Sequence, residues 1–378
     1  AVFGVTYVSY TVPYVVLVPY LTSLGYTGTE QGIITATGSL FGMVMTMIFG
    51  YLCDKFRTIK KFVYLSAALL AVATWVFYSQ TNNVFFFHLI FGMFMQGFWM
   101  ILQGLTDGWA MEENEACRDN YGSIRAFGAI GWIFGGPIVA WVAEQFGYQY
   151  LGLLFTILTL IAFAVEYFVP DADKKPSEKG EELKLSDVKK LIGDKKYLLL
   201  VLLFFLAFFV LQAESYLSIQ KITRLNLDTA AKYTTLKSSF QAIFELPFFF
   251  LGGYLLKKFG AIKLLMVALV VYMARLGLDA VATGQTQMVY ISALQMLTFP
   301  LLAITSKTMI YDAAPAELKS SGMQFATSVY STGSALISPL LCGYLLDTFG
   351  ANASLFGFMA VIIIPLVLCV TYMKAYKN

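Results

Sequence analysis

An aspartate, an arginine and a tryptophan stand inside two apolar segments that follow one another in the sequence. Asp107 lies in the segment 84–110, and Arg125 and Trp132 lie in the segment 121–145. A charged side chain at bilayer depth is costly, so each charge is a hypothesis about function. Arg125 and Trp132 are seven residues apart, which places them on one face of a helix.

A carboxylate, a guanidinium and an indole that face one space suit a ring carrying hydroxyl groups. The charged groups would hydrogen-bond the hydroxyls, and the indole would stack on the C–H face of the ring. The alternative is a salt bridge that locks two helices beside a lipid-facing tryptophan. We favour substrate binding because burying charge is costly. Three glutamines in apolar segments are uncharged candidates for the same role, or equally for contacts between helices: Gln212, Gln241 and Gln295.

Three further charged residues in apolar segments, Glu214, Glu245 and Arg275, suit the coupling of transport to protons. Burial favours a protonated carboxyl, whereas a nearby arginine favours the ionised form. A movement that changes the distance between Glu245 and Arg275 would therefore load or release a proton. We rank Glu245 first and Glu214 second as the carrier. A static ion pair between two helices explains Glu245 and Arg275 equally well.

Metal chemistry and catalysis find little support in the residue types. The four cysteines are scattered singly, and His88 is the one histidine. No paired cysteines, nucleophile and base set, or phosphate-binding loop can be recognised. We therefore predict no enzyme activity, no catalytic residues, no bound metal, no cofactor and no nucleic-acid partner. His88 is interpreted as a satisfied buried residue rather than a proton relay.

The elements that must position these residues are membrane helices. The chain has 378 residues, of which 58% are hydrophobic and only 13% charged, whereas soluble domains carry about 25% charged residues. Apolar stretches long enough to cross a bilayer recur throughout. They predict an all-α membrane protein with twelve transmembrane helices, at 1–24, 29–53, 60–79, 84–110, 121–145, 148–169, 196–220, 231–256, 262–282, 287–311, 320–346 and 351–373.

Residues 170–195 are polar and rich in Lys, Glu and Asp, which predicts a cytoplasmic linker able to form a short amphipathic helix. The predicted domains are a six-helix bundle over 1–169 and a second over 196–378. An internal repeat supports this division. Residues 50–57 (GYLCDKFR) match 253–260 (GYLLKKFG) at five of eight positions, and EQFG at 144–147 matches DTFG at 347–350 at the same offset.

Lys and Arg lie mainly in the loops that follow even-numbered helices, while the odd-numbered loops hold Lys221, Arg224 and Lys232. The bias predicts a multi-pass protein of the inner (plasma) membrane with both termini cytoplasmic. The sequence begins at Ala1 inside an apolar run, so we expect a cytoplasmic N-terminal tail to precede it. Membrane lipids are expected partners, and a monomer is the expected state.

The loop after the second helix carries a recognisable motif. Gly50, Leu52, Asp54 and Lys55 follow the pattern Gly-x-Leu-x-Asp-Lys, which resembles the loop 2–3 motif of the major facilitator superfamily. The resemblance implies a 6+6 pseudo-two-fold fold and a gating role for Gly50, Asp54 and Lys55. Glycine would allow close helix contact, and Asp54 would cap or pair with a neighbouring helix end. The motif's second glycine is Arg57 here, which puts the turn geometry in question.

Residues 122–132 (GSIRAFGAIGW) resemble helix 5 of the lactose permease family, the oligosaccharide–proton symporters. The resemblance implies that Asp107 is a sugar-binding carboxylate, Arg125 an essential arginine and Trp132 a stacking residue. The same region resembles phenylpropionate permeases, and residues 239–245 (SFQAIFE) resemble nucleoside–proton symporters, where a glutamate equivalent to Glu245 binds substrate. Arg275 matches an arginine that the lactose permease family places beside its protonated carboxylate.

These observations predict a secondary active transporter that works by alternating access. Proton-coupled symport of a small polar solute, with a sugar or glycoside favoured, is the leading hypothesis. The proton gradient would be the energy source. A nucleoside or aromatic-acid symporter is the second reading, and an efflux antiporter or a non-transporting sensor are further alternatives. In helix 10 the lactose permease family has Lys, His and Glu where this chain has Ser292, Gln295 and Thr298, so the usual protonation site is missing.

Overall fold

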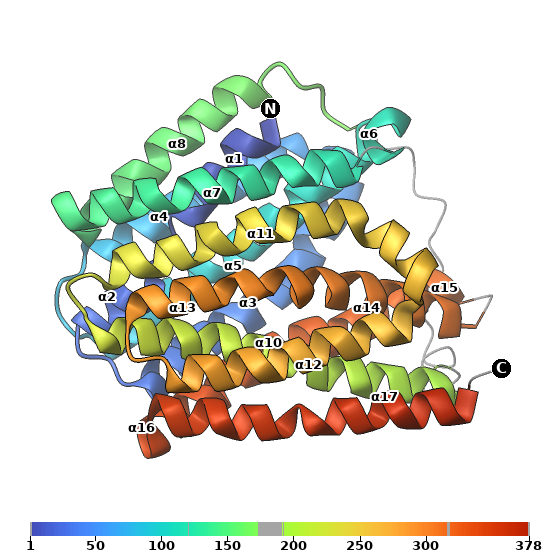
Figure 1. Cartoon of the computed structure of the whole chain (residues 1–378). Coiled ribbons are helices and arrows are strands. Elements are labelled where there is room, and N and C mark those ends of the chain that lie inside the picture. Colours follow the sequence, from blue (N-terminus) through green and yellow to red (C-terminus); the bar gives the residue numbers. More distant parts are fainter. Residues whose placement is uncertain (1, 120, 173–190, 192, 316–317, 377–378) are drawn as a thin grey trace. The chain divides into compact units, whose positions relative to one another are not determined.

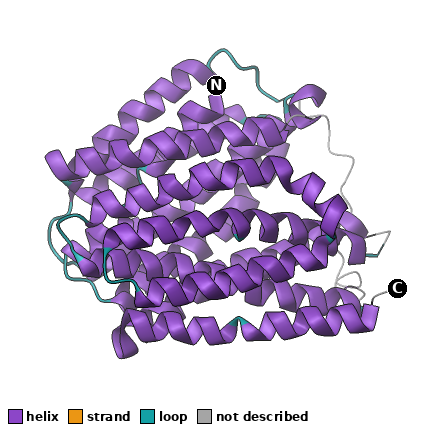
Figure 2. Ribbon diagram, viewed as in Figure 1, coloured by secondary structure: helices purple, strands orange, loops and turns teal. Residues whose placement is uncertain are grey.

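The computed structural model of the protein describes residues 2–119, 121–172, 191, 193–315 and 318–376. Almost all of these residues are helical, and no strand occurs among them (Figure 2). The physical reason is that a membrane offers no water to backbone polar groups. A helix satisfies these groups within one segment. The all-α class predicted from the sequence is therefore observed.

The helices of the first part of the chain follow the predicted apolar segments closely, and two of them reproduce the predicted bounds (Figure 1). They are α1 Val2–Thr11, α2 Leu17–Ser23, α3 Gly28–Phe56, α4 Lys60–Ser79, α5 Phe85–Glu112, α6 Glu115–Asp119, α7 Tyr121–Gln145, the 3-10 turn η1 Tyr148–Tyr150 and α8 Leu151–Glu166.

The later part of the chain is more often interrupted. Its elements are α10 Lys195–Leu225, α11 Ala230–Phe259, α12 Ala261–Val281, α13 Gln285–Ile291, the 3-10 segment η2 Ser292–Leu297, α14 Phe299–Ala313, α15 Lys319–Thr327, the π-helical turn η4 Ser328–Gly333, α16 Ser334–Val361 and α17 Ile363–Tyr376.

Ten spans in the described residues are long and apolar enough to cross a membrane. Two features separate this number from the predicted twelve. The first segment breaks around Pro13 into the short helices α1 and α2. The last two predicted helices run together as the span Gly322–Tyr376, although Gly350 has non-helical backbone angles inside it. The count of twelve stays a prediction.

Helix ends follow local chemistry. The hydroxyl of Thr27 accepts a hydrogen bond from the backbone N–H of Glu30, and the Glu30 carboxylate accepts one from the N–H of Thr27. This capping box starts α3 because it satisfies two of the backbone donors left free at a helix N-terminus. At its other end, α3 stops at Arg57, which has the left-handed angles φ 53° and ψ 43°.

The internal repeat has a backbone counterpart. Arg57 and its repeat partner Gly260 both have positive φ, at 53° and 79°. Gly147 and its partner Gly350 share nearly the same angles, with φ of 95° and 79° and ψ of 164° and 168°. Residues other than glycine essentially never adopt that last conformation. The chain therefore has matching backbone angles at Gly147 and Gly350, whereas Arg57 and Gly260 share only a positive φ, with ψ of 43° and 151°.

The described chain divides into two compact units. The first unit comprises residues 1–178 together with 219–243, and the second comprises 179–218 together with 244–378. The end of α10 and the start of α11 thus belong to the first unit. Most of the predicted linker, residues 173–190 and 192, lies outside the described residues, and its amphipathic helix stays a prediction. The domain boundaries predicted from the sequence also stay predictions.

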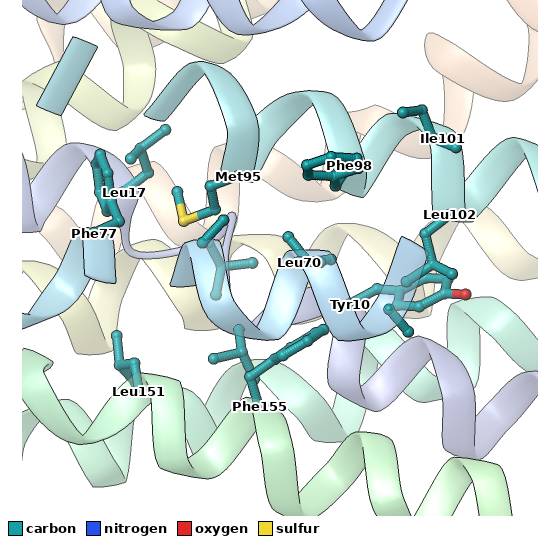
Figure 3. Close-up of a cluster of buried hydrophobic side chains, with 14 of the residues drawn as sticks. Tyr10, Leu17, Leu70, Phe77, Met95, Phe98, Ile101, Leu102, Leu151 and Phe155 are labelled. Carbon is teal, nitrogen blue, oxygen red and sulfur yellow. The ribbon is translucent and has the colours of Figure 1, made fainter. Parts of the chain in front are cut away.

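Each unit has its own apolar core. In the first unit, Leu17 of α2, Leu70 and Phe77 of α4, and Met95 of α5 gather with Phe155 of α8 (Figure 3). The second unit has a separate cluster built from α10, α12 and α16. These cores consist of large aliphatic and aromatic side chains. They hold fixed the helices that carry the polar residues described below.

Close packing of α1 against α7 brings two of the site helices together. A Cβ added at Gly131 of α7 would lie 2.5 Å from the carbonyl oxygen of Gly4 and 2.8 Å from Cβ of Tyr7, both in α1. A Cβ at Gly128 would lie 2.8 Å from the Arg125 guanidinium and 3.2 Å from the Tyr7 ring. Small residues let membrane helices approach closely. Glycine at these two positions therefore leaves room for Tyr7 and Arg125.

Candidate functional site

Asp107 on α5 and Arg125 on α7 meet in the first unit, as the sequence predicted they would. The Arg125 Nε atom lies 3.8 Å from Asp107 Oδ1. Their side chains are 40% and 33% exposed, respectively. The separation is longer than the 2.7–2.9 Å of a charge-assisted hydrogen bond. The two groups are thus held together mainly by Coulomb attraction, and both remain accessible.

Tyr7 of α1 completes this group and was not singled out in the sequence. Its side chain is fully buried, and its hydroxyl donates to Asp107 Oδ1 at 3.1 Å. The Arg125 Cζ atom lies 4.5 Å from the centre of the Tyr7 ring, which is a cation–π contact. One tyrosine therefore orients the carboxylate through its hydroxyl and the guanidinium through its ring. Only the packing of α1 on α7 brings it there.

Trp132 lies two turns from Arg125 on α7 and belongs to an aromatic group. Its ring is edge-on to Tyr14, with centroids 6.2 Å apart. Tyr14 in turn stacks on Trp99 of α5 at 4.6 Å, with the rings almost parallel. Trp99 donates its indole N–H to the Tyr10 carbonyl oxygen at 2.9 Å, which fixes its orientation. Aromatic faces thus lie along the same helices as the charged pair.

The segment 219–243 contributes to the first unit from α10 and α11. The Ser239 hydroxyl donates to the Trp132 carbonyl oxygen at 3.4 Å. Gln220 donates to the Gln31 side-chain oxygen at 2.7 Å, and both amides are buried. Gln241 of α11, a predicted substrate residue, is half-buried in the same segment. Of the three predicted glutamines, it is the one that lies in the unit of Asp107 and Arg125.

The second unit holds a tighter charged group. Arg275 of α12 is fully buried and forms an ion pair with Glu214 of α10 at 2.9 Å between Nη2 and Oε1. Arg275 also donates to the side-chain oxygen of Gln295 in η2. The structure therefore joins Arg275, Glu214 and Gln295, of which Arg275 and Glu214 were predicted coupling residues and Gln295 a predicted substrate residue.

Two more carboxylates interact electrostatically with Arg275, namely Asp279 and Glu245. Asp279 is fully buried one turn further along α12, whereas Glu245 is half-buried on α11. The carboxylate ranked first from the sequence, Glu245, is thus near Arg275, but the ion pair is formed by Glu214, ranked second. Gln212 is half-buried on α10, two residues before Glu214.

Gln295 lies where the helical path between α13 and α14 is interrupted. Its segment leaves the α-helical path in η2, and Thr298 has the non-helical angles φ −111° and ψ −82°. Pro300 then sits in the first turn of α14, where it fits because its missing N–H is not needed. The Thr298 hydroxyl donates to the Gln295 carbonyl oxygen at 3.1 Å. Interrupted helices are common at the binding sites of transporters.

The predicted gating motif lies at the end of α3. Asp54 and Lys55 are exposed, and the Lys55 ammonium lies 6.0 Å from the centre of the Tyr51 ring. A Cβ at Gly50 would meet no heavy atom of the described chain within 4 Å, so the close helix contact expected there is not observed. Arg57, which replaces the motif's second glycine, adopts the left-handed turn that glycine would favour.

A second contact near this loop was not expected from the sequence. Asp171 accepts hydrogen bonds from the Thr58 hydroxyl and from the backbone N–H groups of Ile59 and Lys60, the latter two at 3.0 Å. Ile59 offers no side-chain cap of its own to α4, so Asp171 caps that helix from across the chain. The Lys60 ammonium returns the contact by donating to the Val169 carbonyl oxygen at 2.6 Å.

His88 is fully buried among tyrosines. Its Nε2 atom lies 2.9 Å from the Tyr20 hydroxyl and its Nδ1 atom 2.8 Å from the Tyr26 hydroxyl. Both ring nitrogens are therefore in hydrogen bonds, which fits a satisfied buried histidine. No group of three or more His, Cys, Asp or Glu suited to a metal ion was found in the described part of the chain.

Apolar helices that contain half-buried and buried charges indicate a multi-pass membrane protein. The model of the MFS_1 like family matches residues 2–359. The chain belongs to this family and is a membrane transporter of the major facilitator superfamily.

Known proteins similar to the chain are also transporters. A maltose permease from Geobacillus stearothermophilus is 24% identical over 291 residues, covering 76% of this chain and 72% of the relative. Crystal structures of the nucleoside transporter NupG are similar at TM-scores of 0.83 for a mutant and 0.73, with 14% and 15% identity. Both cover 100% of this chain and 98% of NupG.

A bacterial homologue of the human lysosomal transporter Spinster is similar in its inward-facing, unoccupied form, at a TM-score of 0.67 and 11% identity. The similarity covers 99% of this chain and 93% of the homologue. At these identities the solved structures establish the fold alone.

Proposed function

We propose that the protein is a proton-coupled symporter of a small solute with a hydroxylated ring, and that a sugar or glycoside is the favoured substrate. The observation that carries this proposal is the partly exposed pairing of Asp107 with Arg125, with Trp132 two turns further along the helix of Arg125. A structural salt bridge would be expected to be tight and buried. This one is 3.8 Å long and its side chains are 40% and 33% exposed.

The chemistry of the group fits such a ring. The Arg125 guanidinium can donate paired hydrogen bonds to neighbouring hydroxyls, and the carboxylate of Asp107 can accept them. Trp132 on the same helix offers an aromatic face to the C–H side of the ring. The similarity to a maltose permease points in the same direction. Gln241 is proposed as an additional hydrogen-bonding residue in the same unit.

A nucleoside is the second candidate, since it combines a hydroxylated ribose with a flat base. The high structural similarity to NupG favours it. The aromatic rings of Tyr14, Trp99 and Trp132 would suit a base as well as a sugar. In this reading Glu245 binds substrate instead of carrying the proton.

A ligand screen separates the two candidates. Purified protein is heated with maltose, lactose, uridine, adenosine or phenylpropionate, and the rise in unfolding temperature is recorded. The same panel is run on Arg125→Lys, which keeps the charge but loses the paired donors. A sugar that stabilises the wild type and not the variant supports the proposal. Stabilisation by nucleosides alone would replace the sugar with a nucleoside.

We assign proton coupling to Arg275 with Glu214 and Glu245. Glu214 moves to first place because it makes the ion pair, and Glu245 is the alternative. The test is uptake into sealed liposomes under an imposed pH gradient. Glu214→Gln and Glu245→Gln are compared with the wild type. Loss of gradient-driven uptake with exchange retained in one variant would identify the carrier. Uptake that ignores the gradient in the wild type would exclude proton coupling.

The membrane orientation and the oligomeric state of the protein are proposals as well. We propose twelve membrane helices in two repeated halves, an inner-membrane location with cytoplasmic termini, transport by alternating access and a monomeric state. Gly50, Asp54 and Lys55 are proposed to act in gating. Cysteine labelling from either side of the membrane, at the exposed Thr81 and at the exposed Lys61 near the start of the preceding helix α4, tests the orientation. If Thr81→Cys is labelled from the cytoplasmic side, the orientation is the opposite of the one proposed.

A further inference from the structure

A carboxyl group outside both charged groups is buried in the first unit. Glu166, at the end of α8, is 1% exposed. Its Oε1 atom accepts a hydrogen bond from the Thr6 hydroxyl at 2.8 Å. Its Oε2 atom has no hydrogen-bond partner among the described residues. A buried carboxylate oxygen without a donor is costly, so this oxygen calls for a proton or a bound molecule.

Glu166 lines a small cavity of about 10 Å³. Thr159 lines the same cavity from α8, two turns before Glu166 and on the same face. Its hydroxyl is likewise buried without a hydrogen-bond partner in the described chain. The cavity is of the size that one water molecule needs, and a buried water requires two to four polar partners. Glu166 and Thr159 supply two of them.

Glu166 also lines a second and larger cavity, of about 260 Å³. This cavity is walled by α1, α5 and α7 and includes Glu113 and Cys117, which follow α5 in the loop predicted to face the cytoplasm. Glu166 is the one residue that the small and the large cavity have in common. The side chain of Glu166 therefore lies between the two cavities.

Helix α1 connects Glu166 to the Asp107 group. Thr6 donates to Glu166, and the next residue, Tyr7, donates to Asp107. One turn further on, the Tyr10 hydroxyl lines the small cavity and shares a hydrogen bond of 2.6 Å with Thr106, the neighbour of Asp107. Two carboxyl groups on different helices are thus held by adjacent residues of one helix.

Titratable and charged groups lie near Glu166 on several elements, and Glu113 and Cys117 share the larger cavity with it. Tyr10 of α1 interacts with it electrostatically, as do Tyr64 and Lys60 of α4. Lys60 is not fixed on Glu166, because its ammonium donates to the carbonyl oxygens of Tyr167 and Val169. These neighbours form no ion pair with Glu166, so its charge is not locked.

We propose that Glu166 is a second proton-binding site, which exchanges a proton with water and acts through α1 on the Asp107 group. In the ionised form, Oε2 accepts a hydrogen bond from the cavity water. When a hydronium ion delivers its proton to Oε2, the new O–H donates to that water, which then reverses its orientation toward Thr159. The effect on Asp107 rests on the proposed substrate site, whereas proton binding by Glu166 does not.

Infrared titration of the purified protein tests the proton site. A protonated buried carboxyl should absorb at about pH 7, where exposed carboxyls are ionised. We expect Glu166→Gln to lose this band, Thr159→Val to shift it, and the exposed control Glu115→Gln to leave it unchanged. An identical titration in Glu166→Gln and the wild type would overturn the proposal. Loss of the wild-type band when sodium replaces choline would assign the site to sodium instead.

Ligand affinity tests the connection to Asp107 separately. Maltose and uridine binding is measured across a pH series for the wild type and Glu166→Gln. We expect a change of about fivefold or more in the wild type and a flat profile in the variant, with similar best affinity. An unchanged profile in Glu166→Gln would remove the connection. If the wild type binds neither compound, the proposed substrates fail, and the infrared result still decides the proton site.

Discussion

The two units each hold an arginine beside carboxylates, but they treat the charges differently. In the first unit, Arg125 and Asp107 lie 3.8 Å apart and both are accessible. In the second, Arg275 is 0% and Glu214 3% exposed, at a distance of 2.9 Å. Arg275 also donates to Gln295. The first pair is longer and partly exposed, while the second is short and buried.

The difference in burial determines how much each ion pair contributes to stability and whether it is available to a ligand. An accessible ion pair contributes little to stability, because water screens the attraction. It can exchange its partner for a ligand at small cost. A buried pair must be satisfied within the protein, because removing one partner leaves an uncompensated charge. A substrate site therefore suits the first unit, and a group that responds to a change of charge suits the second.

The largest expected effect comes from breaking the buried pair. Arg275→Met leaves Glu214 without its cation, and we expect it to cost about 3–5 kcal/mol of stability. Thermal unfolding of the detergent-purified protein measures the loss. The double variant Arg275→Met with Glu214→Leu removes both charges and should recover part of it. Equal loss in the single and the double variant would show that the pairing is not the cause.

Breaking the partly exposed pair should affect binding more than stability. Arg125→Ala should change stability by at most about 1 kcal/mol. Loss of its charged hydrogen bonds to a ligand should cost about 1.5–3 kcal/mol, or about 10- to 150-fold in affinity. Calorimetry with the ligand identified by the screen measures this loss. A destabilisation as large as that of Arg275→Met would mean that both pairs are structural.

The cap made by Asp171 is a third charged contact. Its loss should have an effect on stability between those of Arg275→Met and Arg125→Ala. Asp171→Ala removes the acceptor for the first N–H groups of α4, at an expected cost of about 1 kcal/mol. Asp171→Asn, which keeps one acceptor oxygen, should lose less. Unfolding in detergent compares the three proteins. No difference between wild type and Asp171→Ala would show that the contact is dispensable.

The stability that the Asp171 cap contributes should depend on pH. Partial burial raises the pKa of the Asp171 carboxyl, but the hydrogen bonds from Thr58, Lys60, Ile59 and Ala172 outweigh it and hold the pKa below its ordinary value. A carboxyl with a lowered pKa in the folded state adds stability that is fully present above its unfolded pKa of about 4. That stability is lost as the pH falls through the folded pKa. Wild type and Asp171→Ala should therefore converge in acid.

The smallest expected effect is a gain. Arg57→Gly should stabilise the protein by about 0.5 kcal/mol, because relief of the left-handed strain of a residue with a Cβ is partly offset by the larger entropy that glycine loses on folding. Its repeat partner provides the opposite test, since Gly260→Ala should destabilise the protein at a φ of 79°. Unfolding temperatures measure both changes. A loss of stability in Arg57→Gly would mean that the Arg57 side chain makes contacts that outweigh the strain.

Much of the architecture was readable from the sequence. Hydropathy placed the helices, since a segment that crosses a bilayer must be apolar over its length. The repeat at 144–147 and 347–350 coincides with matching turns at Gly147 and Gly350. The pairing of Asp107 with Arg125 was predictable because they lie on consecutive antiparallel helices. The number of spans differs from the predicted twelve, since hydropathy does not register the break at Pro13 or show that the last two helices run together through Gly350.

The sequence by itself determined the membrane helices and which residues carry charge inside them. Apart from the pairing of Asp107 with Arg125, only the tertiary structure decided which partner each charge has. Tyr7 reaches Asp107 and Thr6 reaches Glu166 because α1 packs beside α7 and α8. Arg275 meets Glu214 because α10 and α12 bring them together. Periodicity fixes the face of a helix on which a side chain lies, but the neighbour that the face meets is set by packing over long stretches of chain.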